Sequence, residues 1–515
     1  MANSSINELT TKIDNLSQNL CERLILKLDN KFEFLERNFY AKSFLIAALF
    51  RVDKTKYAKT IDGLIKTISS EIKDKTYHYE FNRYALIDAF GSKKAIEIIG
   101  TKKFTYGKVA NWSLLRTFCR IKEAGNSNLL ALAELTRVKI LFCTPHGIED
   151  SRNYFSSQYN IFSLVLLNET RNISKYFFSD KWMNNAINNC IAQTSSQGVT
   201  NLIGRGSLQT FGYAAYIYLL SFYTKDKNVN KILNDLLNIL HIEFKKNTET
   251  PLVLFKNEKF EEKKYVGEPD LKSLDKLGWY SYNNAPDYSA FTSLMLLKAK
   301  ENIKNNSLNL TLTKPKNKKF CEFANQKFSY QDSNILVLFG IQSKKSNECA
   351  LFNPIIVKGM NFILPPLGGE QSKISNNNDT DFGFPLILDY KLDKVKIKSS
   401  KIFNVRNNSI EQEINYEKNL FLKRRIIMCQ SKIIILDFII NNTNKAFSYS
   451  SLRLTKEKNV NINFKLKSNL FTNKLFKISE KENDIYSTNN LCDSYSVRSL
   501  LSPKEKLIFR GAIIL

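Results

Sequence analysis

Closely paired cysteines and long apolar runs are both absent from the sequence. None of the eight cysteines stands in a Cys-x-x-Cys pair, and their wide spacing argues against a disulfide framework or a structural zinc site. The first twenty residues lack the apolar core of a signal peptide. The best apolar run near them, 43–50, is too short to span a bilayer. We therefore expect no metal, no other cofactor and no membrane span. We also expect a cytoplasmic location, or a periplasmic one if an unrecognised route exports the protein.

Acidic residues are scarce relative to basic ones. Lys and Arg number 76 against 49 Asp and Glu, which gives a formal net charge of +27. Such an excess indicates an anionic partner, namely nucleic acid, an anionic membrane or an acidic glycan. The alternative is compositional, because the chain is rich in Lys, Asn and Ile, as AT-rich coding produces. No dense basic block, zinc finger or RNP motif occurs, so we do not expect nucleic acid as the partner.

The chain of 515 residues is too long for one compact core, so we expect two or more domains. Up to about residue 305, apolar residues recur every three or four positions, as at Leu24, Leu28, Phe32 and Leu35, and this spacing predicts helices. The predicted helices are 18–39, 41–50, 56–72, 79–90, 111–123, 127–141, 157–170, 179–193, 207–223, 228–245 and 288–301. Helices with short connections pack as antiparallel neighbours, which fits a layered toroid or an α-solenoid. The sequence contains no fixed-period repeat of the kind that marks common solenoids, so the solenoid is the less favoured of the two.

A polar segment at 301–319 marks the predicted boundary between a helical domain, 1–305, and a second domain, 306–515. Beyond it, alternating apolar residues such as Phe464 and Leu466 predict strands. Short strands separated by Asn, Ser and Lys turns indicate an antiparallel β-sandwich of about twelve or more strands. The expected fold class is multidomain, α then β.

Five stretches embed polar groups in apolar surroundings, and the first is YHYEFNRYALIDAF, 77–90. It contains His78, Asn82 and Arg83. Glu80 and Arg83 stand three positions apart and are expected to pair on one helix face. One interpretation is a helix start with a salt bridge and packed tyrosines. The other is the wall of a site, because His, Tyr and Arg together can abstract protons and neutralise carboxylates.

The second stretch, NYFSSQYNIFSLVLL, opens a long apolar helix with Gln158, Tyr159 and Asn160. Ser156 or Ser157 is expected to cap that helix by accepting hydrogen bonds from its first amides. A cap explains the serines better than it explains the polar residues that follow them. A functional role for these polar residues therefore stays open beside the structural one.

The third stretch is GRGSLQTFGYAAYIYLL, 204–220. Two glycines flank Arg205 and permit unusual backbone angles, and Ser207 is expected to cap the helix that follows. Gln209, Tyr213 and Tyr216 then share one helix face. Uncharged Gln and Tyr there indicate a wall lined for hydrogen bonding and stacking, and the alternative is a satisfied polar network in the core.

The last two stretches are GWYSYNNAPDYSAF, 278–291, and a long Gly/Asn/Asp loop, 364–384. The former combines aromatic planes with amide donors, a common way to hold sugar rings, and the alternative is a packed loop. Its candidate residues are Trp279, Tyr282, Asn283 and Tyr288, and Asp287 is expected to cap the helix after it. In the loop, which is either an excursion or a flap, Glu370 is the candidate.

Together these pieces resemble the heparinase II/III-like proteins, which belong to the polysaccharide lyases with an α/α toroid followed by an antiparallel β-sandwich. The matching blocks are NRYALIDAF, SSQYNIFSLVLL, GRGSLQTFGYAA and GWYSYNNAPDYSAF, together with the strand pair FLKRRIIMCQSKIIILDFIIN. Their order covers most of the chain. The resemblance implies an incomplete toroid, a β-sandwich and β-elimination in an acidic, uronate-containing polysaccharide or oligosaccharide.

In such lyases a Tyr or His removes the proton α to a carboxylate that polar side chains hold, because the enolate-like dianion needs preorganised donors. Carried over to this chain, the resemblance implies a catalytic set and a substrate-binding set. The catalytic set is Tyr159, Asn160, Arg205, Gln209, Tyr213 and His78. The substrate-binding set is Asn82, Arg83, Tyr216, Trp279, Tyr282, Asn283, Tyr288 and Glu370.

Two departures keep alternatives open. Asn160 stands where a His is expected after the Gln-Tyr pair, and no export signal is visible. Both features favour a non-catalytic protein that binds glycans or assembles surface polysaccharide. A glycoside hydrolase ranks lower, because hydrolysis needs two opposed carboxylates and acidic residues are sparse in these stretches.

Overall fold

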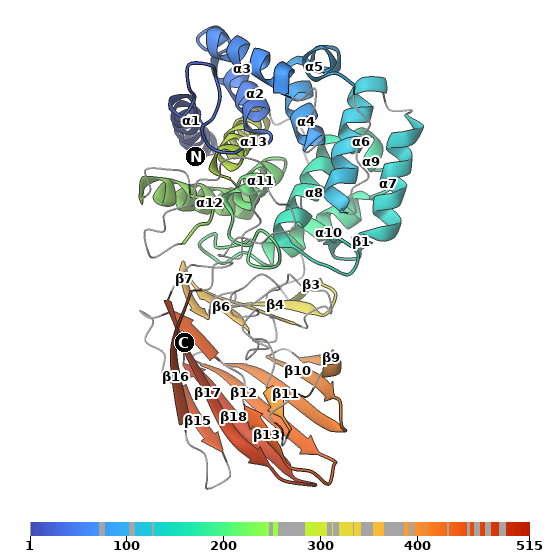
Figure 1. Ribbon diagram of the computed structural model, residues 1–515, viewed down its shortest axis with the longest axis vertical. Coiled ribbons are helices and arrows are strands. Elements are labelled where there is room, and N and C mark those ends of the chain that lie inside the picture. The colour runs from blue at the N-terminus through green and yellow to red at the C-terminus, as the bar shows by residue number, and fades with distance from the viewer. Residues whose placement is uncertain are drawn as a thin grey trace. The chain divides into compact units, whose positions relative to one another are not determined.

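The computed structural model divides the chain into two units, which we treat separately. The first comprises Met1–Asp275 with Trp279–Pro315, and the second comprises Lys276–Gly278 with Lys316–Leu515. The structure describes residues 2–71, 78–101, 109–125, 128–246, 251–255, 284–305, 312, 319–332, 334–340, 354–364, 386–389, 391, 395, 397–406, 408–429, 432–450, 454–457, 464–468, 475–483 and 491–514. Helices form the first unit and antiparallel sheets the second, which confirms the predicted order (Figure 1).

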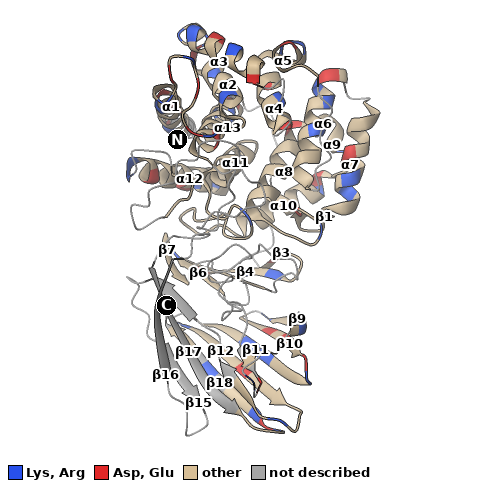
Figure 2. Ribbon diagram, in the orientation of Figure 1, with Lys and Arg blue, Asp and Glu red and all other residues tan. Residues whose placement is uncertain are grey.

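Six helices in the described part of the first unit contact one another in a closed cycle, and we call them the ring helices. Each contacts the next and the last returns to the first: α2 (Ala41–Asp53), α4 (Tyr79–Phe90), α6 (Ala110–Ala124), α8 (Ser157–Glu169), α11 (Thr210–Ser221) and α13 (Ala285–Asn305). Most of their residues are buried. A helix buried all round has no polar face, which explains why α11 carries no charged residue and α8 only Glu169 (Figure 2).

Further helices alternate with the ring helices along the chain and each packs on one or two of them. They are α1 (Ala2–Leu26), α3 (Ala58–Glu71), α5 (Ser92–Ile99), α7 (Leu129–Leu141), α10 (Asp180–Ile191) and α12 (Lys227–Lys246), with the one-turn helix α9 (Arg171–Ser174) between α8 and α10. Neighbours joined by short connections run antiparallel. Every second helix, and hence every ring helix, therefore points the same way.

Contacts between the helix starts confirm this common direction. Asp287 at the start of α13 accepts hydrogen bonds from the backbone amides of Tyr40 and Ala41 at the start of α2. The ring of His78, just before α4, lies 5.5 Å from the ring of Tyr40 and 5.7 Å from that of Trp112 at the start of α6. The starts of α8, α11 and α13 are joined by side-chain hydrogen bonds described below. All six ring helices therefore begin at one end of the ring.

A buried ion network joins three ring helices nearer their other end. Lys298 Nζ in α13 lies 2.9 Å from Asp88 Oδ1 and 2.9 Å from Tyr84 Oη, both in α4. It also pairs with Glu169 at the end of α8. The Glu169 carboxylate accepts a hydrogen bond from Tyr84 Oη at 2.9 Å, and another from Tyr218 Oη at 2.8 Å brings in a fourth ring helix, α11. Each buried charge here has an opposite charge beside it, as burial requires.

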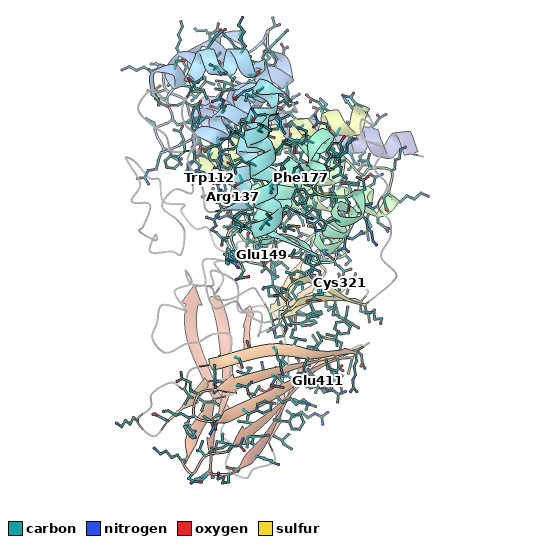
Figure 3. All side chains as sticks on the ribbon, turned by 90° about the vertical axis from the view of Figure 1, so that its right-hand side faces the viewer. Trp112, Arg137, Glu149, Phe177, Cys321 and Glu411 are labelled. Carbon is teal, nitrogen blue, oxygen red and sulfur yellow. The ribbon has the colours of Figure 1, made fainter. Side chains whose placement is uncertain are left out.

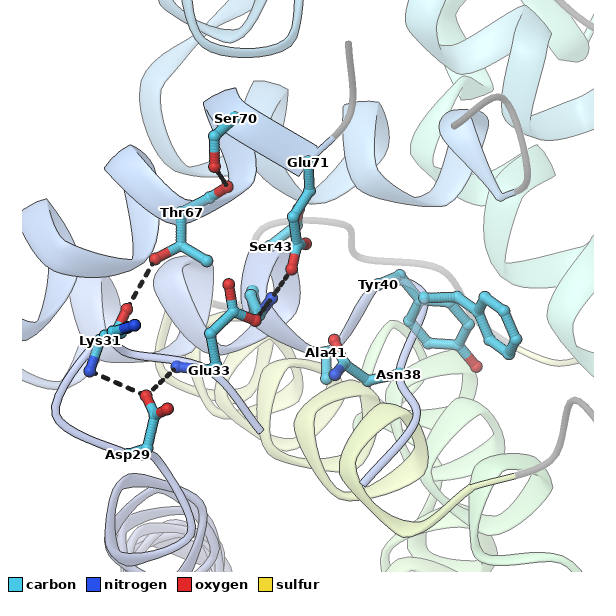
Figure 4. Close-up of polar contacts among 12 residues, drawn as sticks. Asp29, Lys31, Glu33, Asn38, Tyr40, Ala41, Ser43, Thr67, Ser70 and Glu71 are labelled. Atoms are coloured by element: carbon cyan, nitrogen blue, oxygen red, sulfur yellow. Dashed lines mark hydrogen bonds and ion pairs between the residues drawn. The ribbon is translucent and has the colours of Figure 1, made fainter. Parts of the chain in front are cut away.

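The predicted helix 18–39 is wrong in its second half. The α1 helix ends at Leu26, and the Asp29 carboxylate then accepts hydrogen bonds from the backbone amides of Lys31 and Glu33, each at 2.8 Å (Figure 4). An Asp that binds amides two and four residues ahead competes with helical hydrogen bonding and turns the chain. The apolar spacing there belongs to a turn.

The second unit contains three antiparallel sheets in its described residues. Their strand orders are β3-β4-β5-β6-β7, β15-β18-β12-β11-β10-β9 and β14-β17-β13-β8, and β16 pairs with β17. The strands are β3 (Phe320–Ala324), β4 (Lys327–Asp332), β5 (Ile335–Gly340), β6 (Ile355–Lys358), β7 (Asn361–Leu364), β8 (Leu386–Leu388), β9 (Ile397–Arg406), β10 (Ser409–Tyr416), β11 (Leu420–Cys429), β12 (Lys432–Asn441), β13 (Phe447–Ser450), β14 (Leu454–Glu457), β15 (Phe464–Ser468), β16 (Leu475–Asn483), β17 (Leu491–Leu501) and β18 (Lys506–Ile514). The short pair β1 (Cys143–Thr144) and β2 (Gly147–Ile148) belongs to the first unit.

Strand β11 shows how the sequence forms the core of this unit. Its residues alternate strictly between buried and half-buried, so that Leu422 and Ile426 join one hydrophobic cluster with residues of the other sheets. Arg424 occupies an inward position of the same strand. Asp437, directly opposite on β12, matches its charge with two hydrogen bonds of 2.6 Å.

We expect Lys298→Met to destabilise the helical unit by about 3–5 kcal/mol, because it leaves the buried Glu169 without its cation, although Asp88 keeps its ion pair with Arg51. The three tryptophans of the chain all belong to this unit, so tryptophan fluorescence during denaturant unfolding follows it selectively. Lys304→Met, on the exposed face of the same helix, is the matched control and is expected to change little. Equal losses in the two variants would contradict the role of the network.

Candidate functional site

Four of the polar stretches mark the starts of ring helices and so converge on one end of the ring. They lead into α4, α8, α11 and α13. Each helix start carries the positive end of a macrodipole, so this end favours anions. The fifth stretch, 364–384, lies outside the described residues apart from Leu364. Trp279, Tyr282, Asn283 and Glu370 also lie outside the described residues and stay predictions.

Gln209 is the centre of a hydrogen-bond relay between three helix starts. Its Oε1 accepts a hydrogen bond from Gln158 Nε2 in α8 at 3.1 Å and another from Tyr288 Oη in α13 at 3.1 Å. Two donors on the oxygen fix the orientation of the amide. Gln209 is buried, with 6% of its surface exposed, and its Nε2 makes no hydrogen bond within the described part of the chain. The relay therefore leaves an oriented amide donor for a ligand.

Tyr159 and Arg205 form a second, more open pair. The Arg205 guanidinium lies 4.3 Å from the centre of the Tyr159 ring, and both side chains are half-buried. Arg205 Nη2 lies 2.8 Å from Asp150 Oδ2, and Asp150 is buried. Burial raises the pKa of Asp150, and the Arg205 charge and hydrogen bond oppose that rise. The pair places a cation against the face of a tyrosine ring.

Packed aromatic rings connect the relay to this pair. The ring centre of Phe211 lies 6.4 Å from that of Tyr159 and 5.6 Å from that of Tyr288. Phe211 also stacks on Phe291 at 3.7 Å. The polar groups thus stand on a rigid aromatic base, which limits the movement of their side chains.

The loop before α11 needs its glycines, as the sequence predicts. Gly204 and Gly206 have φ angles of 80° and 82°, which favour glycine strongly. A Cβ atom on Gly206 would stand 2.2 Å from Gln158 Nε2. Any larger residue there would displace the amide that orients Gln209.

The predicted helix start at Ser207 is wrong. The helix α11 begins at Thr210, with Gln209 in the N-cap position, and Leu208 has a φ of 57°. Gln209 therefore precedes the helix and does not share a helical face with Tyr213 and Tyr216. Its side chain is free to turn toward α8 and α13.

Tyr213 and Tyr216 lie in the interior of the helical unit. Tyr213 Oη donates to the Thr200 carbonyl at 3.2 Å and accepts from the Thr200 amide at 3.0 Å. Tyr216 Oη accepts a hydrogen bond from Thr194 Oγ1 at 3.3 Å. Burial raises the pKa of both phenols. The structure thus places both hydroxyls in satisfied core contacts, the alternative that the sequence left open.

Asn160 also makes structural contacts. It is 1% exposed, its Oδ1 accepts from the Ile148 amide at 2.8 Å, and its Nδ2 donates to Cys190 Sγ at 3.3 Å. These contacts tie α8 to the β1–β2 hairpin and to α10. Ser156, one of the two predicted caps, caps α8 by accepting from the Tyr159 amide.

His78 is enclosed by aromatic rings. Its ring centre lies 5.1–5.7 Å from those of Phe39, Tyr40, Phe81 and Trp112 (Trp112 is labelled in Figure 3). Burial lowers the pKa of His78 to about 3. The imidazole is therefore neutral at physiological pH.

The predicted pair of Glu80 with Arg83 stays a prediction, because the contacts described for the two residues are with other partners. Arg83 donates to Tyr79 Oη at 2.7 Å and pairs with Glu123, whereas Glu80 lies 3.8 Å from Arg116. Asn82 is also engaged locally: its Oδ1 accepts from Ser43 Oγ at 2.6 Å, and its Nδ2 donates to the Phe39 carbonyl at 2.8 Å.

Asp287 does not cap its own helix, contrary to the prediction. Asn284 does so, because its Oδ1 accepts from the Asp287 amide at 2.8 Å. The Asp287 carboxylate instead accepts from the backbone amides of Phe39, Tyr40 and Ala41 before and at the start of α2. Burial raises its pKa to about 6, and these hydrogen bonds oppose the rise.

Two residues of the site were not assigned from the sequence. Gln158 stands at a helix start, but its partner lies 51 residues away, so the local sequence does not assign it to the site. Asp150 stands in no pattern, and only the fold brings it to Arg205. Within the described residues, no group of three or more His, Cys, Asp or Glu side chains is arranged to hold a metal ion. Among the described helices, none is both long and apolar enough to cross a membrane.

Comparison with known proteins gives weak similarity to polysaccharide lyases. No protein-family model and no curated protein sequence matches the chain. A mutant heparan sulfate lyase HepC from Pedobacter heparinus is similar, with a TM-score of 0.35, 10% identity, and coverage of 97% of this chain and 82% of that chain. The Streptomyces coelicolor A3 chondroitin AC lyase in complex with chondroitin sulphate has a TM-score of 0.44 and 8% identity, and the match covers 98% of this chain and 79% of that chain. A chondroitinase AC lyase has a TM-score of 0.47 and 8% identity, and the match covers 98% of this chain and 82% of that chain. Similarity at this level assigns no role to any residue.

We expect the stability of the helical unit to fall as the pH drops from about 6.5 toward 3, and His78 to cause part of that fall. Its pKa is about 3 when folded and about 6.5 when unfolded, so the unfolded chain gains a proton first, at a cost of about 1.4 kcal/mol per pH unit. Stability from this group is complete above pH ~6.5. His78→Phe keeps the ring and should flatten the slope of unfolding free energy against pH.

The slope is the decisive quantity in this experiment, because a pH-independent penalty of the substitution cancels from it. His241→Gln, which replaces an exposed histidine on α12, is the matched control. Partial burial lowers the pKa of His241 too, but far less than that of His78, so this variant should change the slope less than His78→Phe. Equal slopes for wild type and His78→Phe would show that His78 is not buried in its neutral form.

Proposed function

We propose that the end of the ring where its helices begin binds an acidic, uronate-containing glycan and cleaves it by β-elimination. The oriented amide of Gln209 carries this proposal, because its oxygen is held by Gln158 and Tyr288 while its nitrogen donor is left for a ligand. Tyr159 and Arg205 stand over the same aromatic base. The net charge of +27 and the aligned helix starts favour an anionic ligand.

In the proposed reaction, Gln209 Nε2 donates to the substrate carboxylate and Arg205 supplies positive charge. The Tyr159 phenolate takes the proton from the carbon α to that carboxylate. The electron pair of the broken C–H bond forms a double bond to the β carbon, whose bond to the glycosidic oxygen breaks. That oxygen then takes the proton from Tyr159, which restores the phenolate. Donors already fixed in place stabilise the enolate-like dianion without reorganisation.

We also propose that the helical unit is an α/α toroid and the second unit a β-sandwich, as the sequence resemblance implies. The closed cycle of six ring helices supports the toroid, here a complete ring where the sequence led us to expect an incomplete one. The hydrophobic cluster shared by strands of the three sheets supports a sandwich-like packing of the second unit.

A second candidate is a non-catalytic glycan-binding protein, such as one that assembles surface polysaccharide. The enclosure of His78 and the engaged hydroxyl of Tyr213 favour it, because they leave Tyr159 as the base on which elimination depends. A hydrolase has less support. Asp150, Asp287 and Glu80 are buried carboxylates at this end, and they lie against Arg205, backbone amides and Arg116 respectively. Hydrolysis instead needs two carboxyl groups facing the substrate.

Incubation with a panel of uronate polysaccharides tests elimination, and the ultraviolet absorbance of the unsaturated product measures it. We expect Tyr159→Phe to lower the rate about 10²–10⁴-fold, the usual effect of removing a general base, with little change in glycan affinity. Tyr176→Phe, at an exposed tyrosine, is the matched control. Binding without product in the wild type would favour the second candidate, and neither binding nor product across the panel would contradict both.

Gln209→Glu tests the amide donor. The variant replaces the donor by a carboxylate, and we expect the dissociation constant for an acidic oligosaccharide to rise about tenfold or more, equivalent to about 1.4 kcal/mol. Gln197→Glu, at an exposed position, controls for the added negative charge. Calorimetric titration measures both variants, and an unchanged affinity of Gln209→Glu would remove Gln209 from the site.

A further inference from the structure

The segment that leads into α8 holds the loop that carries Arg205. The Ser157 amide donates to the Ile203 carbonyl at 2.9 Å, so the two segments lie backbone to backbone. A Cβ atom on Gly204 would stand 2.5 Å from the Phe155 carbonyl oxygen, which shows how closely the two backbones approach. The loop and the start of α8 are therefore expected to move as one body.

Three side chains of this segment each fix a different group of Arg205. Its backbone amide donates to Tyr154 Oη at 2.9 Å, and its carbonyl accepts from Ser156 Oγ at 2.7 Å. Its guanidinium donates from Nη2 to Asp150 Oδ2 at 2.8 Å. The peptide and the side chain of Arg205 are thus both oriented, which an ion pair alone would not achieve.

Asp150 stands on a backbone that is itself fixed. Its amide donates to the Tyr154 carbonyl at 3.0 Å, and its carbonyl accepts at 2.9 Å from the amide of Ala110 at the start of α6. A side chain supported in this way can keep its partner within the narrow range of orientations that a binding site needs.

The burial of the ion pair between Asp150 and Arg205 is one-sided. The Asp150 side chain is 2% exposed and the Arg205 side chain 20%, whereas both side chains of the Arg424–Asp437 pair are fully buried. In that core pair each charge satisfies the other. At the helix starts, by contrast, a buried acid holds a cation that lies 4.3 Å from the centre of the Tyr159 ring and still meets solvent.

We propose that Asp150 is a positioning residue, which holds the Arg205 guanidinium beside Tyr159 so that an acidic glycan meets the cation in one fixed orientation. Asp150 does not touch the glycan and acts through Arg205. A guanidinium already held in place loses less side-chain freedom when a ligand binds, so the ligand binds more tightly. This inference rests on the proposed function, because the orientation of Arg205 matters only if this end of the ring binds the glycan.

A double-mutant cycle separates positioning from a simple charge effect. Asp150→Asn keeps the shape of the side chain and an acceptor oxygen but loses the charge that holds the guanidinium. Loss of a negative charge alone would tighten the binding of an anionic glycan. Loss of positioning should instead raise the dissociation constant for an acidic oligosaccharide about tenfold, and less than about twofold when Arg205→Ala is already present.

Calorimetric titration measures the wild type, the two single variants and the double variant. Asp62→Asn, at an exposed position of α3, removes the same charge far from the pair in sequence and is the matched control, expected to leave the affinity unchanged. Tyr154→Phe is a second positioning variant, which removes the hydroxyl that accepts from the Arg205 amide and keeps the ion pair. It should also weaken binding only while Arg205 is present, and it carries the same cycle if Asp150→Asn does not fold.

Tighter binding by Asp150→Asn, or an equal loss of affinity with and without Arg205, would overturn the positioning role and leave the proposed function standing. An affinity that Arg205→Ala does not change would remove Arg205 from the site and overturn the positioning role with it. A wild type that binds no acidic oligosaccharide would contradict the proposed function itself, and this inference would fall with it.

Discussion

The structure of the helical unit depends on one constraint: six helices that run the same way are buried against one another in a closed ring. Burial removes water from their faces, so each polar group in them needs a partner within the ring. Parallel alignment adds their macrodipoles, positive where the helices begin and negative where they end. The carboxylate of Asp287 lies at the positive end, and the cation of Lys298 lies toward the negative end, within its network of two carboxylates.

This constraint separates structural polar residues from candidates for function. Asn160, Tyr213 and Asn82 complete their hydrogen bonds inside the packing. They are therefore parts of the framework that sets where the helix starts lie. Gln209 and Tyr159 differ, because the former is oriented by two donors on its amide oxygen and the latter is half-buried beside the Arg205 guanidinium. The proposed chemistry depends on the side chains of Gln209 and Tyr159, which the packing holds in place at the helix starts.

Local sequence pattern was sufficient for the class of each region and for several boundaries. Strand β12 follows from its apolar run, and the Gly204–Gly206 loop follows from its glycines. The local pattern gave wrong predictions where the structure depends on contacts with other parts of the chain. The turn at Asp29 looked like a continued helix because the apolar spacing persists through it. The local pattern predicted Gln209 as a helical residue. Its hydrogen bonds with Gln158 and Tyr288 could not be predicted, because the local sequence does not show which helix starts lie together.

The most direct test is a crystal structure of the chain with a short uronate oligosaccharide. We expect the uronate carboxylate within hydrogen-bond distance, about 2.7–3.2 Å, of Gln209 Nε2, with the sugar beside the Tyr159 ring. Such a complex would place the ligand at the end where all ring helices begin. An oligosaccharide bound only on the sheets of the second unit, or at the other end of the ring, would contradict the proposed site.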